Sequence, residues 1–130
     1  MEERGTRGPE RGKMLAGISK AILGIHRQYY GRGASSARTL MDHDYVICFL
    51  EDIYTPAERT LVEAGEIEAV TQTRLAFQRA MQTRFTEVVE QATGRTVRAF
   101  LSQTHIKPDI SCEIFVLQPD DSHSAATGSR

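Results

Sequence analysis

Arginine is the residue type whose placement in this sequence most directly suggests chemistry. The chain carries 13 arginines and only three lysines. Three of the arginines stand in unusual settings: Arg32 between two glycines, Arg38 six residues later, and Arg74 inside an apolar stripe. Because a planar guanidinium pairs in a bidentate way with carboxylates and phosphates, these positions indicate either internal ion pairs or recognition of an oxyanion.

The segment YYGRGASSAR, residues 29–38, admits two interpretations. In the first, Gly31 takes a left-handed conformation just past the end of a helix, and Gly33 eases the chain into a strand. In the second, Arg32 and Arg38 surround glycine amides that no side chain shields, and together they form a small anion pocket. The dipole at a helix C-terminus repels anions, so the arginine charges would have to overcome it.

Arg74 lies between Val70 and Phe77 in the apolar stripe of a predicted long helix. A charge that faces a protein core requires a partner, because burial without one is costly. One interpretation is a structural ion pair with Glu58 or Asp52. The other is an arginine that faces a ligand between helix and sheet. The sequence leaves both interpretations open.

Catalytic and metal chemistry find no support in the sequence. The four histidines and two cysteines have no metal-ligand spacing. Phosphate-loop, dinucleotide-binding and serine-hydrolase motifs do not occur. We therefore predict no enzyme activity, no catalytic residue, no metal and no cofactor. Cys48 and Cys112 lie in strand-like settings and are interpreted as small core residues rather than a disulfide.

Hydrophobic periodicity and capping residues predict the helices that position these arginines. An amphipathic helix starts near Leu15 and ends before Gly31. The capping box TPAE at residues 55–58 begins a short helix. A second long helix, which carries Arg74, ends before Gly94.

Two hairpins complete the set of predicted elements. The first covers residues 38–51 with a turn at 42–44, and the second joins TVRAFLS to SCEIFVL through HIKPDI. Two hairpins can form one sheet, and helices can bury their apolar stripes against it. The predicted fold class is therefore α+β: two layers, with a four-stranded antiparallel sheet from two hairpins, and two long helices and a short helix packed on one face.

The second predicted strand, YVICFL at residues 45–50, is apolar on both of its alternating faces. A strand of this kind is typically covered on both sides. The helices can cover only one side, and a second copy of the chain is the economical cover for the other, so we predict a homodimer. Phe49, Phe100 and Phe115 have the spacing of core residues.

The chain is long enough for one domain. Residues 1–12 lack apolar periodicity and are expected to form a disordered arm, residues 13–118 the α+β domain, and residues 119–130 a disordered tail. Neither a long apolar run nor a secretory signal is recognisable, which predicts a cytoplasmic location. A membrane partner would place the protein at the periphery of the inner face of the membrane.

The sequence also resembles a known family over residues 13–118. The matching features are GRG at 31–33, TPAE at 55–58 with Leu61, then Arg74 and Phe77 on the long helix, TG at 93–94 and EIFVL at 113–117. Together they are similar to the MpsC-like family, a group of bacterial domains named for a subunit of a sodium-translocating, membrane-potential-generating system. The resemblance implies a small component that accompanies membrane proteins for cation-coupled or inorganic-carbon uptake, and it implies no catalytic residues.

Two functional hypotheses follow. The first is a non-enzymatic, dimeric accessory protein that contacts a membrane transport subunit and senses a small anion. Its candidate ligand- or partner-binding residues are Gly31, Arg32, Gly33, Arg38 and Arg74. The alternative is a nucleic-acid-binding module that uses the arginine- and glycine-rich arm and the GRG loop beside a four-stranded sheet. The formal net charge of -1 disfavours nucleic acid as a partner.

Overall fold

The computed structural model describes residues 8–31 and 36–119 of the chain. Its elements follow in the order α1 (Gly8–Tyr30), β1 (Ser36–Asp42), β2 (Tyr45–Glu51), α2 (Pro56–Glu63), α3 (Ile67–Thr93), β3 (Val97–His105) and β4 (Ile110–Leu117). Helix, hairpin, short helix, long helix and hairpin therefore succeed one another as predicted. The α+β class with a four-stranded antiparallel sheet is confirmed.

Helix α1 begins earlier than the sequence analysis places it. Residues 8–12, which were expected in the disordered arm, form the start of this helix. Pro9 stands in the first turn, where a missing amide hydrogen costs nothing and a fixed φ suits the helix. The Arg11 guanidinium donates to the backbone carbonyl of Met41 on β1, so a tertiary contact holds this end. The folded unit therefore includes residues 8–12, while 1–7 and 120–130 lie outside the described residues.

A glycine follows each of the three helices in the described residues, and Gly31 and Gly94 were expected from the sequence. Gly31, Gly65 and Gly94 have φ values of 89°, 85° and 72° after α1, α2 and α3. Glycine lacks the Cβ that makes this left-handed conformation unfavourable for other residues. At the start of α2, the Thr55 side chain accepts from the Glu58 amide, and the Glu58 carboxylate accepts from the Thr55 amide, both at 3.1 Å. The predicted capping box is thus present.

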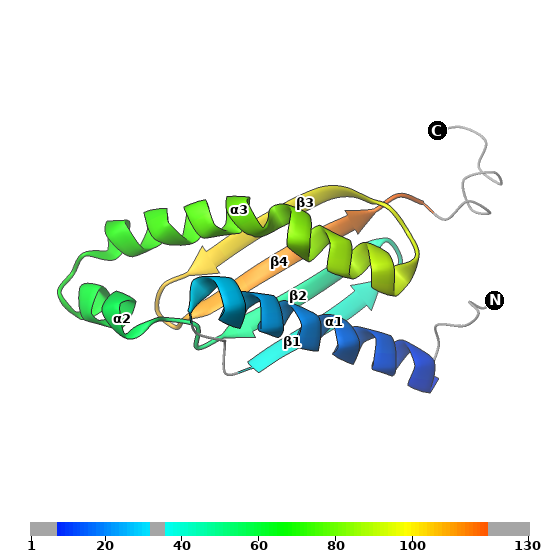
Figure 1. Ribbon diagram of the computed structural model, residues 1–130, viewed down its shortest axis with the longest axis horizontal. Helices are drawn as coiled ribbons and strands as arrows, with labels where there is room; N and C mark the ends of the chain where they lie inside the picture. The colour runs from blue at the N-terminus through cyan, green and yellow to red at the C-terminus, as the bar shows by residue number, and fades with distance from the viewer. Residues whose placement is uncertain (1–7, 32–35, 120–130) are drawn as a thin grey trace.

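The two hairpins join into one antiparallel sheet with the strand order β1-β2-β4-β3 (Figure 1). Strands β2 and β4 form the junction, and Ile47 lies opposite Ile114 near its middle. The first hairpin turns at His43 and Asp44, and His43 has a φ of 55°. Two-residue hairpin turns of this tightness need left-handed backbone, which suits the right-handed twist of the strands.

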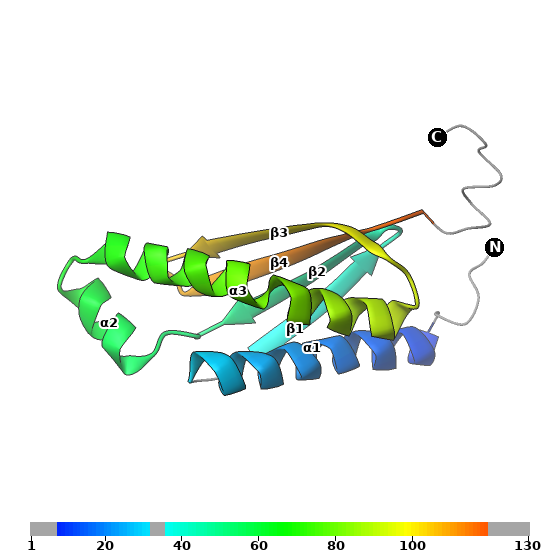
Figure 2. The ribbon, with the colours of Figure 1, turned by 45° about the horizontal axis from the view of Figure 1, so that its top comes forward.

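Helices α1 and α3 lie side by side on one face of the sheet (Figure 2). Helix α1 packs over β1 and α3 over β3, whereas α2 packs on α3 and lies beyond the ends of the strands (Figure 1). The core fills the space between helices and sheet. It consists of Ile18, Ile22, Val46, Cys48, Leu50, Ile53, Met81, Phe85, Val89, Phe115 and Leu117.

Strand β2 shows that the described residues cover one side of the sheet and leave the other side exposed. Its inward residues, Val46, Cys48 and Leu50, are almost completely buried against the helices. On the other side, Tyr45 is 48% exposed and Phe49 is 36% exposed. The prediction that Phe49 is a core residue is therefore wrong for the single chain, because no described element covers that side.

Candidate functional site

The sheet face turned away from the helices, called the outer face below, has no cover from residues 8–31 and 36–119. Strand pairing arranges its side chains in four rows, each crossing β1, β2, β4 and β3 in that order. The rows are Ser36, Glu51, Ile110 and His105; then Arg38, Phe49, Cys112 and Gln103; then Leu40, Ile47, Ile114 and Leu101; and finally Asp42, Tyr45, Val116 and Ala99.

The third of these rows, called the apolar row, contains only aliphatic side chains from all four strands. Leu40 at one end is 45% exposed, and Leu101 at the other end is 53% exposed. The two neighbouring rows are apolar on the central strands and polar or small at the edges. An apolar centre with a polar rim is the usual composition of a protein–protein interface.

Arg38 is the predicted binding residue that lies on the outer face. It stands on edge strand β1 opposite Phe49, is exposed, and has no ion pair with any described residue. Asp42 lies on the same face of the same strand and is 85% exposed at its side chain, where it contacts His43 Nδ1 at 2.8 Å. One free cation and one anion therefore flank the apolar row on β1.

The GRG loop is described only at its first residue. Gly31 follows α1 with a φ of 89°, which agrees with the interpretation of this glycine as a helix stop. Arg32 and Gly33 lie outside the described residues. Arg38 and Arg74 are not brought together, because Arg38 faces outward from β1 whereas Arg74 lies on α3, on the opposite side of the sheet.

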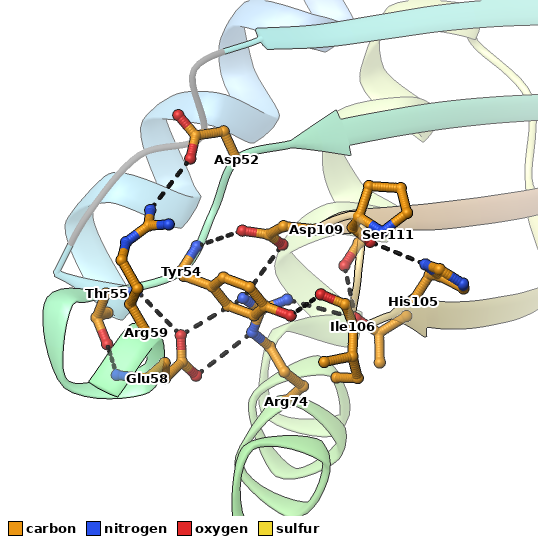
Figure 3. A network of polar contacts seen from close by, with 12 residues as sticks. Asp52, Tyr54, Thr55, Glu58, Arg59, Arg74, His105, Ile106, Asp109 and Ser111 are labelled. Atoms are coloured by element: carbon orange, nitrogen blue, oxygen red, sulfur yellow. Dashed lines mark hydrogen bonds and ion pairs between the residues drawn. The ribbon is translucent and has the colours of Figure 1, made fainter. Parts of the chain in front are cut away.

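Arg74 lies at the centre of a buried network that links α3, α2 and the β3–β4 turn (Figure 3). The arginine is 1% exposed. Its guanidinium is 3.4 Å from the Glu58 carboxylate and 3.5 Å from Asp109 Oδ1. It also donates to the Tyr30 hydroxyl at 2.9 Å and to Thr104 Oγ1 at 3.3 Å. Two carboxylates and two hydroxyls therefore surround one cation.

Aromatic rings complete the enclosure of this guanidinium. Its central carbon lies 4.8 Å from the ring centroid of Tyr54 and 5.5 Å from that of Tyr30. Tyr54 also donates its hydroxyl to the Ile106 carbonyl, and its amide donates to Asp109 Oδ2 at 2.7 Å. An incoming anion would have to displace carboxylates that are already in place, which makes Arg74 a poor ligand site.

Sequence reasoning found one of the two carboxylate partners of Arg74. Glu58 was named as a candidate and is observed, whereas Asp52, the other candidate, lies 3.5 Å from Arg59 instead. Asp109 was missed, because Pro108 and Asp109 read as ordinary turn residues. The signal that could have found it is the need of a buried guanidinium for more than one acceptor.

Glu113 is a second buried ionisable group, on the helix-facing side of β4, and is 2% exposed. Burial raises its pKa to about 7, although a hydrogen bond from the Ser102 hydroxyl at 2.5 Å opposes the rise. Beside Ser102, α3 and β3 line an open pocket of about 180 Å³, below the roughly 300 Å³ of typical drug-sized sites. The pocket is lined by Leu75, Gln78, Arg79, Gln82, Phe100 and Ser102.

Known proteins resemble this chain over most of its length. Residues 10–119 match the family model described as Na+-translocating membrane potential-generating system (MpsC). A protein of Bacillus subtilis (strain 168) named "Uncharacterized protein YbcI" is 30% identical over 91 residues, which cover 69% of this chain and 73% of that protein. No solved structure matches the chain significantly. Within residues 8–31 and 36–119, no helix has the length and hydrophobicity needed to cross a bilayer.

Proposed function

The chain belongs to the MpsC family, and we propose that it is a non-enzymatic accessory protein of a membrane-potential-generating or cation transport system. It acts by protein–protein contact rather than by chemistry on a substrate. Contact with a membrane subunit brings it to the inner face of the membrane. The outer face of the sheet is the surface through which it assembles.

One observation carries this proposal: the outer face is apolar at its centre and exposed in the single chain. Leu40, Tyr45, Phe49 and Leu101 are each at least 36% exposed and lie in adjacent rows of one surface. Exposed side chains of this size, when contiguous, cost solubility unless a partner covers them. A contact function accounts for this exposed apolar surface.

The arrangement of the arginines does not favour anion sensing. Of the arginines that suggested it, Arg74 already binds Glu58 and Asp109, and Arg32 lies outside the described residues. Arg38 is exposed and has no ion pair with any described residue, and its position beside the apolar row suits a charge at the rim of a protein contact.

Binding of single-stranded nucleic acid is a second candidate, because Tyr45 and Phe49 are exposed on a central strand of the open sheet face. Aromatic rings on such a face can stack with bases. The charges oppose it, since Arg38 shares the outer face with Asp42 and Glu51. A phosphate backbone needs several cations along its path.

The test is an affinity pull-down of the tagged full chain from the membranes of its own cells. Wild type is compared with Leu101→Asp, which places a charge at an exposed end of the apolar row. The matched control is Lys20→Asp, which introduces the same side chain at an exposed position of α1, on the far side of the sheet. Bound proteins and bound nucleic acid are both identified.

Recovery of subunits of an ion-translocating membrane complex with wild type and with Lys20→Asp, but not with Leu101→Asp, supports the proposal. Equal recovery with all three proteins rejects the outer face as the contact surface. Recovery of RNA that falls steeply with added salt favours the second candidate.

A further inference from the structure

We infer that the outer face binds the outer face of a second copy of this chain, and that a two-fold axis parallel to the apolar row relates the two copies. The inference rests on the proposed function and deepens it: a second copy covers the outer face, and the resulting dimer contacts the membrane subunit through its remaining surface. The two sheets meet in a defined register. In that register, Arg38 of each copy lies against the partner's Asp42.

The apolar row is what makes the outer face complementary to itself. A rotation of 180° about an axis along this row places each residue of the row over the same residue of the partner. Leu40, Ile47, Ile114 and Leu101 then form a continuous aliphatic centre. An isologous contact of this kind, in which one patch pairs with itself, is the commonest way in which proteins form dimers.

The rows on either side exchange places under the same rotation. The row that contains Arg38 and Phe49 comes to lie over the partner's row that contains Asp42 and Tyr45. Each interface thereby gains two opposite-charge pairs and two aromatic pairs, one at each symmetry-related position. The guanidinium of Arg38, which has no ion pair with any described residue, is thereby paired with the partner's Asp42, whose exposed carboxylate contacts His43 within its own chain.

A two-fold axis parallel to the strands is the alternative, and the charges disfavour it. That rotation places β1 over the partner's β3, so Arg38 would face Gln103 and Asp42 would face Ala99. Both charges would be brought to a contact without a charged partner, at a desolvation cost. Charge complementarity therefore selects the axis along the apolar row.

The twist of the sheets leaves the charge pairs within reach. Aligned sheets pack at about 30° to one another. Arg38 lies about 10 Å from the centre of the face, given strand spacings of about 4.8 Å and a rise of about 3.3 Å per residue. A rotation of about 30° displaces it by roughly 5 Å, which a long arginine side chain can span.

The area of the outer face is consistent with a weakly associating dimer. Four strands of about seven residues project an area of roughly 440 Å² per copy, from the standard spacing and rise. Protruding side chains make the accessible area larger than its projection, so two copies approach the roughly 1,200 Å² at which specific interfaces begin. The contact is therefore expected to be reversible, with dissociation observable at micromolar concentrations.

The experiment is sedimentation equilibrium on the purified full chain across a range of concentrations. Wild type is compared with Arg38→Asp, with Asp42→Arg, and with the double variant that exchanges the two charges. Lys20→Asp again serves as the control for a reversed charge elsewhere. Circular dichroism establishes that each variant is folded.

We expect a wild-type dimer whose dissociation constant rises about tenfold or more in each single variant, because two attractive pairs become two repulsive ones. The double variant should recover most of the affinity, since the pairs are restored with opposite orientation. Lys20→Asp should leave the constant unchanged.

A wild-type chain that is monomeric at every concentration overturns the inference, and so does a dimer that all three charge variants leave intact. The proposed function is judged separately. If the chain is monomeric while Leu101→Asp still abolishes capture of membrane subunits, the surface is a contact site for another protein and only the inference fails. If the chain is monomeric and Leu101→Asp leaves the capture of membrane subunits unchanged, both the inference and the proposed function fail.

Discussion

At the scale of single residues, Arg74 is the side chain on which the arrangement of α2, α3 and the β3–β4 turn depends most. It balances the buried carboxylate of Glu58 on α2 and the largely buried carboxylate of Asp109 in the β3–β4 turn. Replacing a buried cation that has charged partners is costly, because the partners remain buried without compensation.

We therefore predict that Arg74→Met lowers the free energy of unfolding by about 3–5 kcal/mol, the usual cost of breaking a buried pair. Urea unfolding measures it. Arg79→Met, at an exposed position of the same helix, should change stability by no more than about 0.5 kcal/mol. If Arg74→Met is as stable as wild type, the ion pairs are not structural and the ligand-facing interpretation of Arg74 returns.

Glu113 leads to a prediction about pH. Its pKa is raised from 4.5 to about 7, so the folded chain keeps a proton that the unfolded chain has lost between these values. The contribution of Glu113 to the free energy of unfolding is therefore fully present below about pH 4.5 and is lost as the pH rises to about 7. The loss approaches about 3 kcal/mol at 1.36 kcal/mol per pKa unit.

Glu113→Gln should remove this dependence, because an amide does not ionise. Unfolding in urea at pH 5, 6, 7 and 8 would show wild type weakening relative to the variant across this window. The exposed substitution Glu87→Gln should follow wild type. A constant difference between wild type and Glu113→Gln at all four pH values would mean that Glu113 is ionised throughout.

The sequence could indicate these buried residues only where a pattern made their burial conspicuous. Arg74 interrupts a helical apolar stripe, so its need for a partner was visible, and Glu58 was within reach through the capping box. Glu113 interrupts a strand in the same way, but its burial depends on which face of β4 meets the helices. That is fixed by pairing with β2, which is distant in sequence.

At the scale of elements, the start of α2 combines a local and a tertiary role in one side chain. The Glu58 carboxylate accepts from the Thr55 amide at 3.1 Å and lies 3.4 Å from the Arg74 guanidinium. The cap therefore does more than begin a helix of eight residues, because it also orients that helix against α3.

Mutations at Thr55 and Glu58 distinguish the capping role of Glu58 from its ion pair with Arg74. Thr55→Ala removes the hydroxyl cap and should cost about 1 kcal/mol of unfolding free energy. Glu58→Ala should cost about 3 kcal/mol or more, because it also leaves Arg74 short of a buried partner. Thr60→Ala, on the exposed side of α2, is the control. Equal losses for Thr55→Ala and Glu58→Ala would show that Glu58 acts in the cap alone.

Element boundaries were predictable where a backbone requirement picks out a residue type. Glycines with positive φ end α1 and α3, and Thr55 with Pro56 begins α2, so these limits could be inferred locally. The start of α1 could not, because residues 8–12 contain two glycines and a proline, and their helix is supported by a contact of Arg11 with β1. That contact joins residues distant in sequence, so it can be identified only once the fold is known.

At the scale of the whole molecule, the double apolar face of β2 is the sequence feature that the single chain leaves unexplained. Two helices cover the inner side of the sheet. The sequence predicted that two hairpins form one antiparallel sheet, but it did not predict that β2 pairs with β4. The rows of the outer face follow from the register between strands, and the register is set by long-range pairing. The proposed dimer uses that register directly.

A dimer that dissociates on unfolding makes thermal stability depend on concentration. For a chain of this size, a tenfold increase in protein concentration should raise the Tm by about 3 °C, from the usual entropy of unfolding per residue. In Leu101→Asp, a carboxylate at an exposed end of the apolar row should abolish this slope, because the monomer gains nothing from concentration. Lys20→Asp should retain it. A wild-type Tm that stays constant over a hundredfold range would mean that the outer face carries no second copy.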